Sequence, residues 1–357
     1  MGGGGLALAG AGAAYFGFHG MGSMEEYNAS VASTREALKE APEALDLIRY
    51  ATLGANSHNS QPWRFKVRDD GITILPDIAR RLTAVDPDDH HLFASLGCAA
   101  ENLAIAAAMR SMPGTLNFTP EGHGEVHFNR DGRAISEAML FAAIPKRQST
   151  RTDYDGNPIS AADINTLRTA AAVPGVDLIL ITDRLKLNQI RDLVVTGNSA
   201  QMADAAFVRE LKAWLRFNPV QALKRGDGLF TATSGNPILP SRLGPTMFDL
   251  TFKASTENDK YARQIATSAG IAVFVAQGEG PEHWVQTGRA CQRFALAATA
   301  LGLKHAFLNQ PVEVAQLRGE LAALVGMPGR RPDILMRFGY GAALPYSARR
   351  PVAAVLA

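Results

Sequence analysis

Apolar residues recur with helical spacing in two long stretches of this chain that match each other. Residues 97–108 and 288–299 place apolar side chains at i, i+3, i+4 and i+7, which predicts two amphipathic helices. The stretches align without gaps. Each is preceded by a largely apolar run, 71–75 and 271–275, that is typical of a strand. The pattern therefore predicts the same strand-and-helix unit twice.

A second set of matched positions makes chance a poor explanation for this likeness. Ser33-Thr34-Arg35 matches Ser149-Thr150-Arg151, and an isoleucine in a predicted amphipathic helix follows 15 residues after each serine. Each helix leads through a loop to an apolar strand, at 64–67 and 178–181. We therefore expect a duplicated α+β fold, with two sheets, helices packed around them and a pseudo-twofold relation within one chain.

The second copy is longer than the first. Near the start of the copies, matched positions lie 116 residues apart, and at the two long helices they lie 191 residues apart. The difference means that the second copy holds about 75 extra residues, within about 183–265. This insert contains a predicted amphipathic helix over 202–217 and loops rich in proline and glycine, which is typical of a lid. A surface addition that only aids solubility is the alternative. The first repeat is expected over 26–145 and the second over 146–357.

The first 25 residues have a different character. Residues 2–20 are apolar, uncharged and rich in glycine, too much so for a transmembrane helix, but about as long as the apolar region of a signal peptide. One interpretation is a twin-arginine export signal whose basic start lies upstream of Met1, which implies a periplasmic or cell-envelope protein. The other is a disordered tail on a cytoplasmic protein.

Composition narrows the classes of function. The 36 basic and 34 acidic residues are interspersed and leave a net charge of only +2, so no nucleic-acid partner is expected. The two cysteines, Cys98 and Cys291, lie in alanine-rich helical stretches and are predicted to be buried apolar residues rather than a disulfide or metal pair. The eight histidines include no HExxH motif, so no metal site is expected.

An acidic cluster precedes the first long helix. Asp86, Asp88 and Asp89 lie directly before His90-His91. Carboxylates favour the amino-terminal end of a helix, and we interpret the cluster as a helix start rather than a catalytic centre.

The polar segment Ser57-His58-Asn59-Ser60-Gln61 is the strongest candidate for binding. It places two amide side chains, Asn59 and Gln61, two residues apart, and the stiff pair Pro62-Trp63 follows before an apolar strand. Such a loop suits a wall against a flat ligand with a polar edge, such as a flavin ring.

Basic residues form a second candidate site. Arg147, Ser149 and Arg151 alternate on a segment before a predicted helix start at Ser160, and two guanidinium groups with a hydroxyl suit a phosphate. A solvated arginine pair is the alternative. Near the C-terminus, Arg349-Arg350 would close on the same phosphate if the apolar residues 352–356 anchor that end by packing; a plain basic tail is the alternative.

Together these motifs resemble the FMN-dependent nitroreductase family. The resemblance extends from about residue 30 over most of the chain and fails mainly in the insert. It rests on Ser57-x-Asn59-x-Gln61-Pro62-Trp63, on Arg147-x-Ser149-x-Arg151, on the helix over 288–302 with Leu308-Asn309-Gln310-Pro311, and on Gly339-Tyr340 with Arg349-Arg350-Pro351. The fused layout is similar to the Acg-like branch of that family. One departure is Ala55-Asn56, where usual members have a proline before the first serine of the loop.

The resemblance implies a nitroreductase-like fold in which two halves share one flavin. In the family, the phosphate is held by one subunit and the ring is lined by the other. Here one chain would supply both parts, which predicts one FMN per chain and a monomer that acts as an internal pseudo-dimer. The predicted FMN-binding residues are Arg147, Ser149, Arg151, Leu308, Gln310, Arg349 and Arg350 from the second repeat, and Ser57, Asn59 and Gln61 from the first. Arg35, the counterpart of Arg151, would belong to the degenerate site.

The function implied is an FMN-dependent oxidoreductase. NADPH or NADH would be the electron donor, and a quinone or nitroaromatic compound a plausible acceptor. The flavin would carry the chemistry, so no catalytic side chain is expected. The alternative is an FMN-sequestering or redox-sensing protein in which the lid covers the flavin and little turnover occurs.

Overall fold

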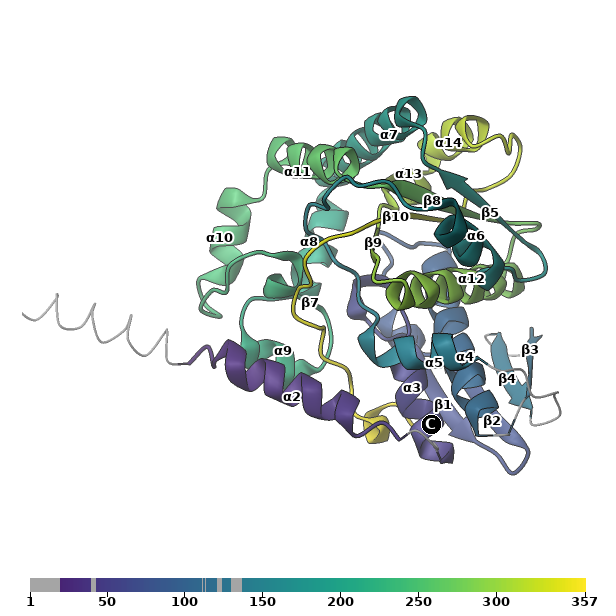
Figure 1. Cartoon of the computed structure of the whole chain (residues 1–357). Coiled ribbons are helices and arrows are strands. Elements are labelled where there is room, and N and C mark those ends of the chain that lie inside the picture. Colours follow the sequence, from purple (N-terminus) through teal and green to yellow (C-terminus); the bar gives the residue numbers. More distant parts are fainter. Residues whose placement is uncertain (1–19, 40–42, 111, 113, 121–123, 130–136) are drawn as a thin grey trace, which may run out of the picture.

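The computed structural model describes residues 20–39, 43–110, 112, 114–120, 124–129 and 137–357 (Figure 1). Most of the signal-like segment lies outside these residues, so its export remains a prediction. The end of that segment lies within the described residues. Helix α2 (Met24–Glu36) begins there at Met24, and Ser23 and Glu26 form a reciprocal capping box.

Two four-stranded antiparallel sheets form the framework. The first contains β1 (Trp63–Val67), β2 (Gly71–Pro76), β4 (Glu125–Asn129) and β3 (Thr115–Thr119), in that order. The second contains β5 (Val176–Ile181), β8 (Gly270–Ala276), β10 (Ile334–Gly339) and β9 (Lys304–Phe307). In both sheets, neighbouring strands follow the same order: the first strand in the sequence lies at one edge, followed by the second, the fourth and then the third at the other edge. This shared order supports the duplication, and the predicted α+β class is confirmed.

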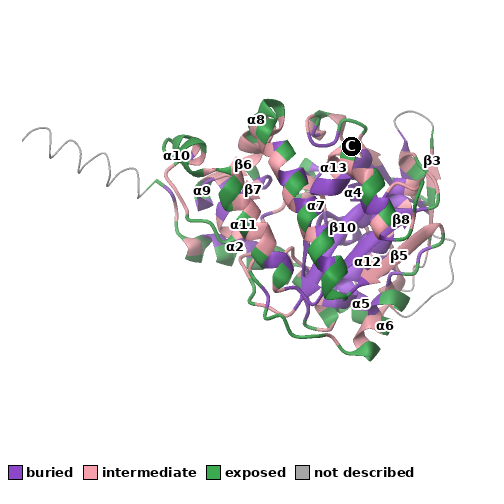
Figure 2. Cartoon of the chain, turned by 90° about the horizontal axis from the view of Figure 1, so that it is seen from above, coloured by how far each residue is buried: buried purple, intermediate pink, exposed green. Residues whose placement is uncertain are grey.

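A long helix follows the second strand of each sheet, and these two helices pack against each other. They are α4 (His90–Met109) and α12 (Pro281–Ala300), the predicted matched pair, and both are largely buried (Figure 2). Their backbones touch at two glycines. A Cβ atom on Gly97 would lie 2.0 Å from the carbonyl oxygen of Val285, and one on Gly288 would lie 1.9 Å from that of Ala94. The crossing joins the two repeats into one core.

Shorter helices surround this crossing: α3 (Ala44–Thr52), α5 (Ala138–Ala143) and α6 (Ala161–Ala170). The hydroxyl of Ser160 accepts from the Asp163 amide at 3.0 Å, which confirms the predicted helix start. Cys98 and Cys291 are free and buried, as expected. One described helix, α4, has the length and apolar composition of a membrane span, and 83% of that stretch is buried inside the protein.

The insert forms a helical layer over one side of the molecule. It comprises α7 (Arg184–Ala203), α8 (Ala205–Trp214), β6 (Leu215–Arg216), α9 (Pro219–Arg225), β7 (Leu229–Phe230), α10 (Gly244–Thr251) and α11 (Ala254–Ala266). The single helix predicted over 202–217 is wrong. Asp204 has an extended backbone and its side chain caps α8, so one helix ends and the next begins there.

The C-terminal arm returns to the first repeat. After β10 the chain passes α2 and runs beside β1, where the Phe65 amide donates to the Val355 carbonyl at 2.7 Å and the Ala357 amide donates to the Phe65 carbonyl at 2.9 Å. Val355 is fully buried, which confirms that the apolar end anchors this arm. Two helices precede the arm in the second repeat, α13 (Gln310–Glu313) and α14 (Arg318–Leu324).

Candidate functional site

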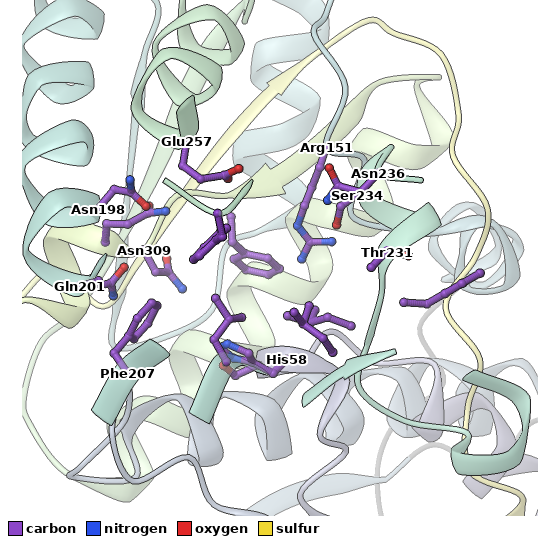
Figure 3. Close-up of a pocket in the computed structure, with 18 of the residues that line it drawn as sticks. His58, Arg151, Asn198, Gln201, Phe207, Thr231, Ser234, Asn236, Glu257 and Asn309 are labelled. Carbon is purple, nitrogen blue, oxygen red and sulfur yellow. The ribbon is translucent and has the colours of Figure 1, made fainter. Parts of the chain in front are cut away.

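A cavity of about 500 Å³ lies between the loop after α3, the start of α4, the insert and α13 (Figure 3). Three predicted site residues line it: Ser57, Arg151 and Gln310. Asn198 and Gln201 lie on one side of the drawn cavity, and Arg151 lies on the other side, near Ser234 and Asn236 (Figure 3). Its wall combines insert aromatic side chains with polar groups from both repeats, a composition typical of a ligand site.

The backbone of the predicted binding loop is unusual. His58, Asn59 and Gln61 all have a left-handed conformation, with φ of 51°, 52° and 52°. Non-glycine residues rarely adopt it, and such strain gathers at functional sites. The Asn56 side chain stabilises the turn by accepting from the Gln61 amide at 2.9 Å. Because of this reversal, Ser57 and His58 line the large cavity, whereas Asn59 does not.

A smaller pocket of about 40 Å³ lies next to the large one and shares Arg151 with it. Most of the predicted phosphate group meets here, together with two residues of the first repeat, Arg35 and Asn59, that were expected elsewhere. The relevant lining residues are Arg35, Asn59, Arg147, Ser149, Arg151 and Arg349. Ser149 is positioned by β9, since its backbone bridges to His305. The structure thus brings the two predicted basic segments together.

The electrostatics of the small pocket favour an anion. Among the described residues, no carboxylate pairs with its four arginines. Burial lowers the pKa of Arg147 and of Arg151, and burial together with the neighbouring Arg147 and Arg35 lowers the pKa of Arg349 strongly. The Nε atom of Arg147 is buried and has no hydrogen-bond partner among the residues that the structure describes. A phosphate would supply the missing charge and acceptor, so these residues fit the phosphate of FMN.

Three predicted site residues lie outside both cavities. Gln61 is fully buried and joins the arm to the insert: its Nε2 donates to the Gly226 carbonyl at 2.8 Å, and its Oε1 accepts from the Arg350 amide at 2.8 Å. The Arg350 guanidinium faces Asp77, with Nη1 3.6 Å from Oδ2. Leu308 belongs to the apolar core of the second repeat. In this structure these residues support the site rather than line it.

Asn59 has a similar structural role at the edge of the small pocket. Its Nδ2 donates to the carbonyls of Gly228, at 3.0 Å, and Ala348, at 3.1 Å, and its Oδ1 accepts from the Arg349 guanidinium. It therefore holds one phosphate arginine and the insert against the binding loop.

The insert is tied to the site by a buried ion-pair cluster. Asp227, in the turn between α9 and β7, pairs with Arg80 and with Arg216, whose Nη2 lies 2.7 Å from Oδ1. The Gly228 amide also donates to the Asn59 carbonyl at 3.1 Å. These contacts fasten this turn of the insert to the binding loop.

Arg35 was expected to belong to a degenerate site, and the structure contradicts this. It lines the small pocket, and its guanidinium lies over the Tyr346 ring at 4.0 Å. Burial lowers its pKa to about 10, and Arg147 adds to this effect. Sequence matching missed the contact because α2 reaches the pocket only where it packs against the C-terminal arm.

Replacing Arg35 with alanine is therefore expected to weaken FMN binding about tenfold, the size of one charge-assisted hydrogen bond. Fluorescence titration of FMN with the apoprotein measures the change. Arg35→Lys keeps the charge and should recover part of the loss. An unchanged dissociation constant in the alanine variant would show that α2 does not contribute.

Several cavity residues were not among the predicted FMN-binding residues. His58 lines the large cavity, and burial lowers its pKa to about 4. His91 and Glu313 line it too and form an ion pair, with Nε2 3.3 Å from Oε1. The sequence signal was the His90-His91 pair, which was assigned only to a helix start. That assignment is correct for Asp86, which accepts from the amides of His91 and Leu92 at 2.9 Å.

Comparison with known proteins gives one family match and several relatives. The model of the nitroreductase family matches residues 144–341. A Mycobacterium tuberculosis (H37Rv) protein whose name provisionally assigns it as an NAD(P)H nitroreductase is 25% identical over 331 residues, covering 89% of this chain and 92% of the relative. The acg protein of the same strain, named in the same way, is 21% identical over 319 residues, covering 85% and 92%.

Solved structures with a similar fold cover little more than half of the chain. An FMN-bound nitroreductase from Bacteroides fragilis has a TM-score of 0.36 and 16% identity, covering 57% of this chain and 88% of its own. The FMN-dependent nitroreductase NfnB from Mycobacterium smegmatis, in complex with NADPH, has a TM-score of 0.38 and 12% identity, covering 57% and 87%.

Proposed function

Because the chain belongs to the nitroreductase family, we propose that it is an FMN-binding oxidoreductase that takes electrons from NAD(P)H and reduces a small acceptor. The observation that carries this proposal is the pocket of four arginines, with no carboxylate among its described lining residues, adjoining a cavity large enough for a flat ligand. The nitroreductase names of the relatives support it.

The chain's own residues divide the work of holding the cofactor. Arg147, Ser149, Arg151 and Arg349 would bind the phosphate, with Arg35 beside them, and the loop at Ser57 would line the ring. When bound, FMN supplies hydride acceptance from NAD(P)H and hydride transfer to the second substrate. Site residues come from both repeats, so one chain would form one complete site as an internal pseudo-dimer.

The lining of the large cavity supports an aromatic acceptor such as a quinone or nitroaromatic compound. Phe207, Phe217, Phe248 and Phe252 of the insert contribute to its wall. Aromatic side chains pack favourably against flat rings. The insert therefore acts as a wall of the acceptor site. The alternative of a flavin-storing protein draws no support from the names of the relatives.

The test is to purify the protein, measure bound FMN by its yellow absorbance, and add NADPH without oxygen. Rapid bleaching, followed by recovery of colour on adding a quinone, is expected. Persistent yellow that only dithionite bleaches would instead indicate flavin storage. A colourless protein that does not take up added FMN would contradict both functions.

A further inference from the structure

A line of buried titratable side chains leads from the core of the second repeat to the wall of the large cavity. The Oδ1 atom of Asp333 lies 2.9 Å from Nε2 of His90, and Nδ1 of His90 lies 3.2 Å from Nδ1 of His91. Nε2 of His91 then lies 3.3 Å from Oε1 of Glu313. Only the last two residues, His91 and Glu313, line the cavity.

The two histidines are not needed to begin helix α4. Asp86 already caps its start. His90 is 1% exposed and His91 6% exposed, and apolar side chains at these positions would fill the same space without burying charge. Replacing a buried ion pair with packed apolar residues is often neutral or stabilising, so a functional role is the better explanation.

The hydrogen-bond geometry assigns a direction to the line. Burial holds the pKa of His90 well below its ordinary value, so this ring is neutral. Burial also raises the pKa of Asp333 to about 6, which leaves a carboxylate at neutral pH. That carboxylate accepts Nε2–H of His90, and Nδ1 of His90 is then free to accept Nδ1–H of His91. His90 and Asp333 therefore stabilise the imidazolium form of His91, much as an orienting carboxylate does in a catalytic triad.

The surroundings of His91 also favour its protonated form. Burial opposes its charge, but the hydrogen bond to Glu313 and the nearby Asp86 outweigh burial and raise its pKa. The same contact helps lower the pKa of Glu313. The other charged or titratable groups that interact with the line include His58, Asp88, Tyr261, Arg318, Arg330 and Arg331. The Glu313 carboxylate is held in place by Gln201, whose Nε2 donates to Oε2 at 2.5 Å.

We propose that the His91–Glu313 pair is the proton donor of the cavity and protonates the oxygen of a quinone or nitro acceptor as that acceptor is reduced. This inference rests on the proposed function. A quinone that becomes a hydroquinone takes up one hydride, which carries the electron pair, and one proton. The N–H bond at Nε2 of His91 breaks, the proton passes by way of the Glu313 carboxylate, and an O–H bond forms on the acceptor. Solvent returns the proton to His91.

The position of the pair suits this role. Gln201, its hydrogen-bond partner, lies on the other side of the drawn cavity from Arg151 (Figure 3). Arg151 and the partner of the proton donor therefore lie on different sides of the cavity, and we expect a ring bound between them to leave one side free for the acceptor. This placement defines the acceptor class: compounds whose reduction leaves negative charge on an oxygen that must gain a proton.

The experiment isolates the acceptor step. FMN-loaded protein is reduced with dithionite under nitrogen and mixed with 1,4-benzoquinone or with ferricyanide, and the return of flavin absorbance is followed. His91→Gln and Glu313→Gln are each expected to slow oxidation by the quinone about a hundredfold, the size of general acid catalysis. Ferricyanide takes up one electron and no proton, so the loss of a proton donor should not affect it. The rate of flavin oxidation by ferricyanide should therefore fall less than about threefold in both variants.

His127→Gln is the matched control. His127 forms a histidine–glutamate pair on β4, with Nε2 3.6 Å from Glu125, and it lines neither cavity. This variant should keep the wild-type quinone rate. If His91→Gln slows flavin oxidation by quinone and by ferricyanide equally, the residue is structural and the proposal is overturned. Quinone rates that stay at the wild-type value in both cavity variants would overturn it as well.

A second readout needs no flavin. In the FMN-free protein, the C2 proton of His91 should titrate in NMR spectra above the ordinary value of 6.5, and Glu313→Gln should lower that pKa. Titration of the wild-type residue below 6.5 would overturn the proposal. A protein that binds no FMN but shows the raised His91 pKa would contradict the proposed function and leave the proton-holding pair intact. Failure of the proposed function can therefore be told apart from failure of this inference.

Discussion

Arg151→Ala is expected to weaken FMN binding roughly a hundredfold, as the loss of two charge-assisted hydrogen bonds would. Arg151 lies where the small pocket meets the large cavity, so its guanidinium can reach the phosphate of an FMN whose ring lies in the large cavity. No described carboxylate neutralises it, and burial lowers its pKa, so a bound anion would be its main counter-charge. The dissociation constant follows from fluorescence titration of the apoprotein with FMN.

Arg168→Ala is the matched control, since Arg168 is exposed on α6 and lines neither cavity. Its FMN affinity should stay within about twofold of wild type, the size of a typical surface substitution. Riboflavin, which lacks the phosphate, gives a second comparison: the Arg151 variant should bind riboflavin about as well as wild type does. Equal losses of FMN and riboflavin would show that Arg151 does not act on the phosphate.

Local patterns in the sequence predicted the framework because they reflect local physics. Strands such as 71–75 and 271–275 and the two long helices have strong apolar periodicity, and they occur where expected. The alternating Arg147, Ser149 and Arg151 were also predictable, because phosphate sites need forked cationic donors. Their meeting with Arg349 followed from the anchored apolar end of the arm, which the sequence also indicated.

The remaining features depend on how distant segments pack. The left-handed conformation of Asn59 and Gln61 determines where their amides point, and no local signal required it. Gln61 thus binds the insert and the arm instead of lining a cavity. Arg35 reaches the pocket only because α2 packs against the arm. The pairing of His91 with Glu313 joins positions 222 residues apart in the sequence, and only the assembled fold brings them into contact.

Gly288→Ala is expected to destabilise the protein by about 3 kcal/mol, at the upper end for overpacking a core. The added Cβ would lie 1.9 Å from the carbonyl oxygen of Ala94, a backbone atom that cannot move without separating α4 from α12. Urea unfolding followed by circular dichroism measures the loss. Gly319→Ala, also in a helix, meets no atom within 4 Å and should be neutral or stabilising by up to about 1 kcal/mol.

The same substitution tests whether the helix crossing supports the binding loop. At the crossing, Gln292 on α12 donates to Asn102 on α4 at 2.7 Å and accepts from the amide of Ala55, in the loop, at 3.1 Å. Separating the helices would pull on this connection, so Gly288→Ala should also weaken FMN binding, even though Gly288 lines neither cavity. A variant that loses stability but binds FMN as tightly as wild type would show that the loop is held by the arm and insert alone. The helix crossing joins the two repeats, and the proposed FMN site takes residues from both. If that site is correct, a substitution that disturbs the crossing should lower both the stability of the protein and its affinity for FMN.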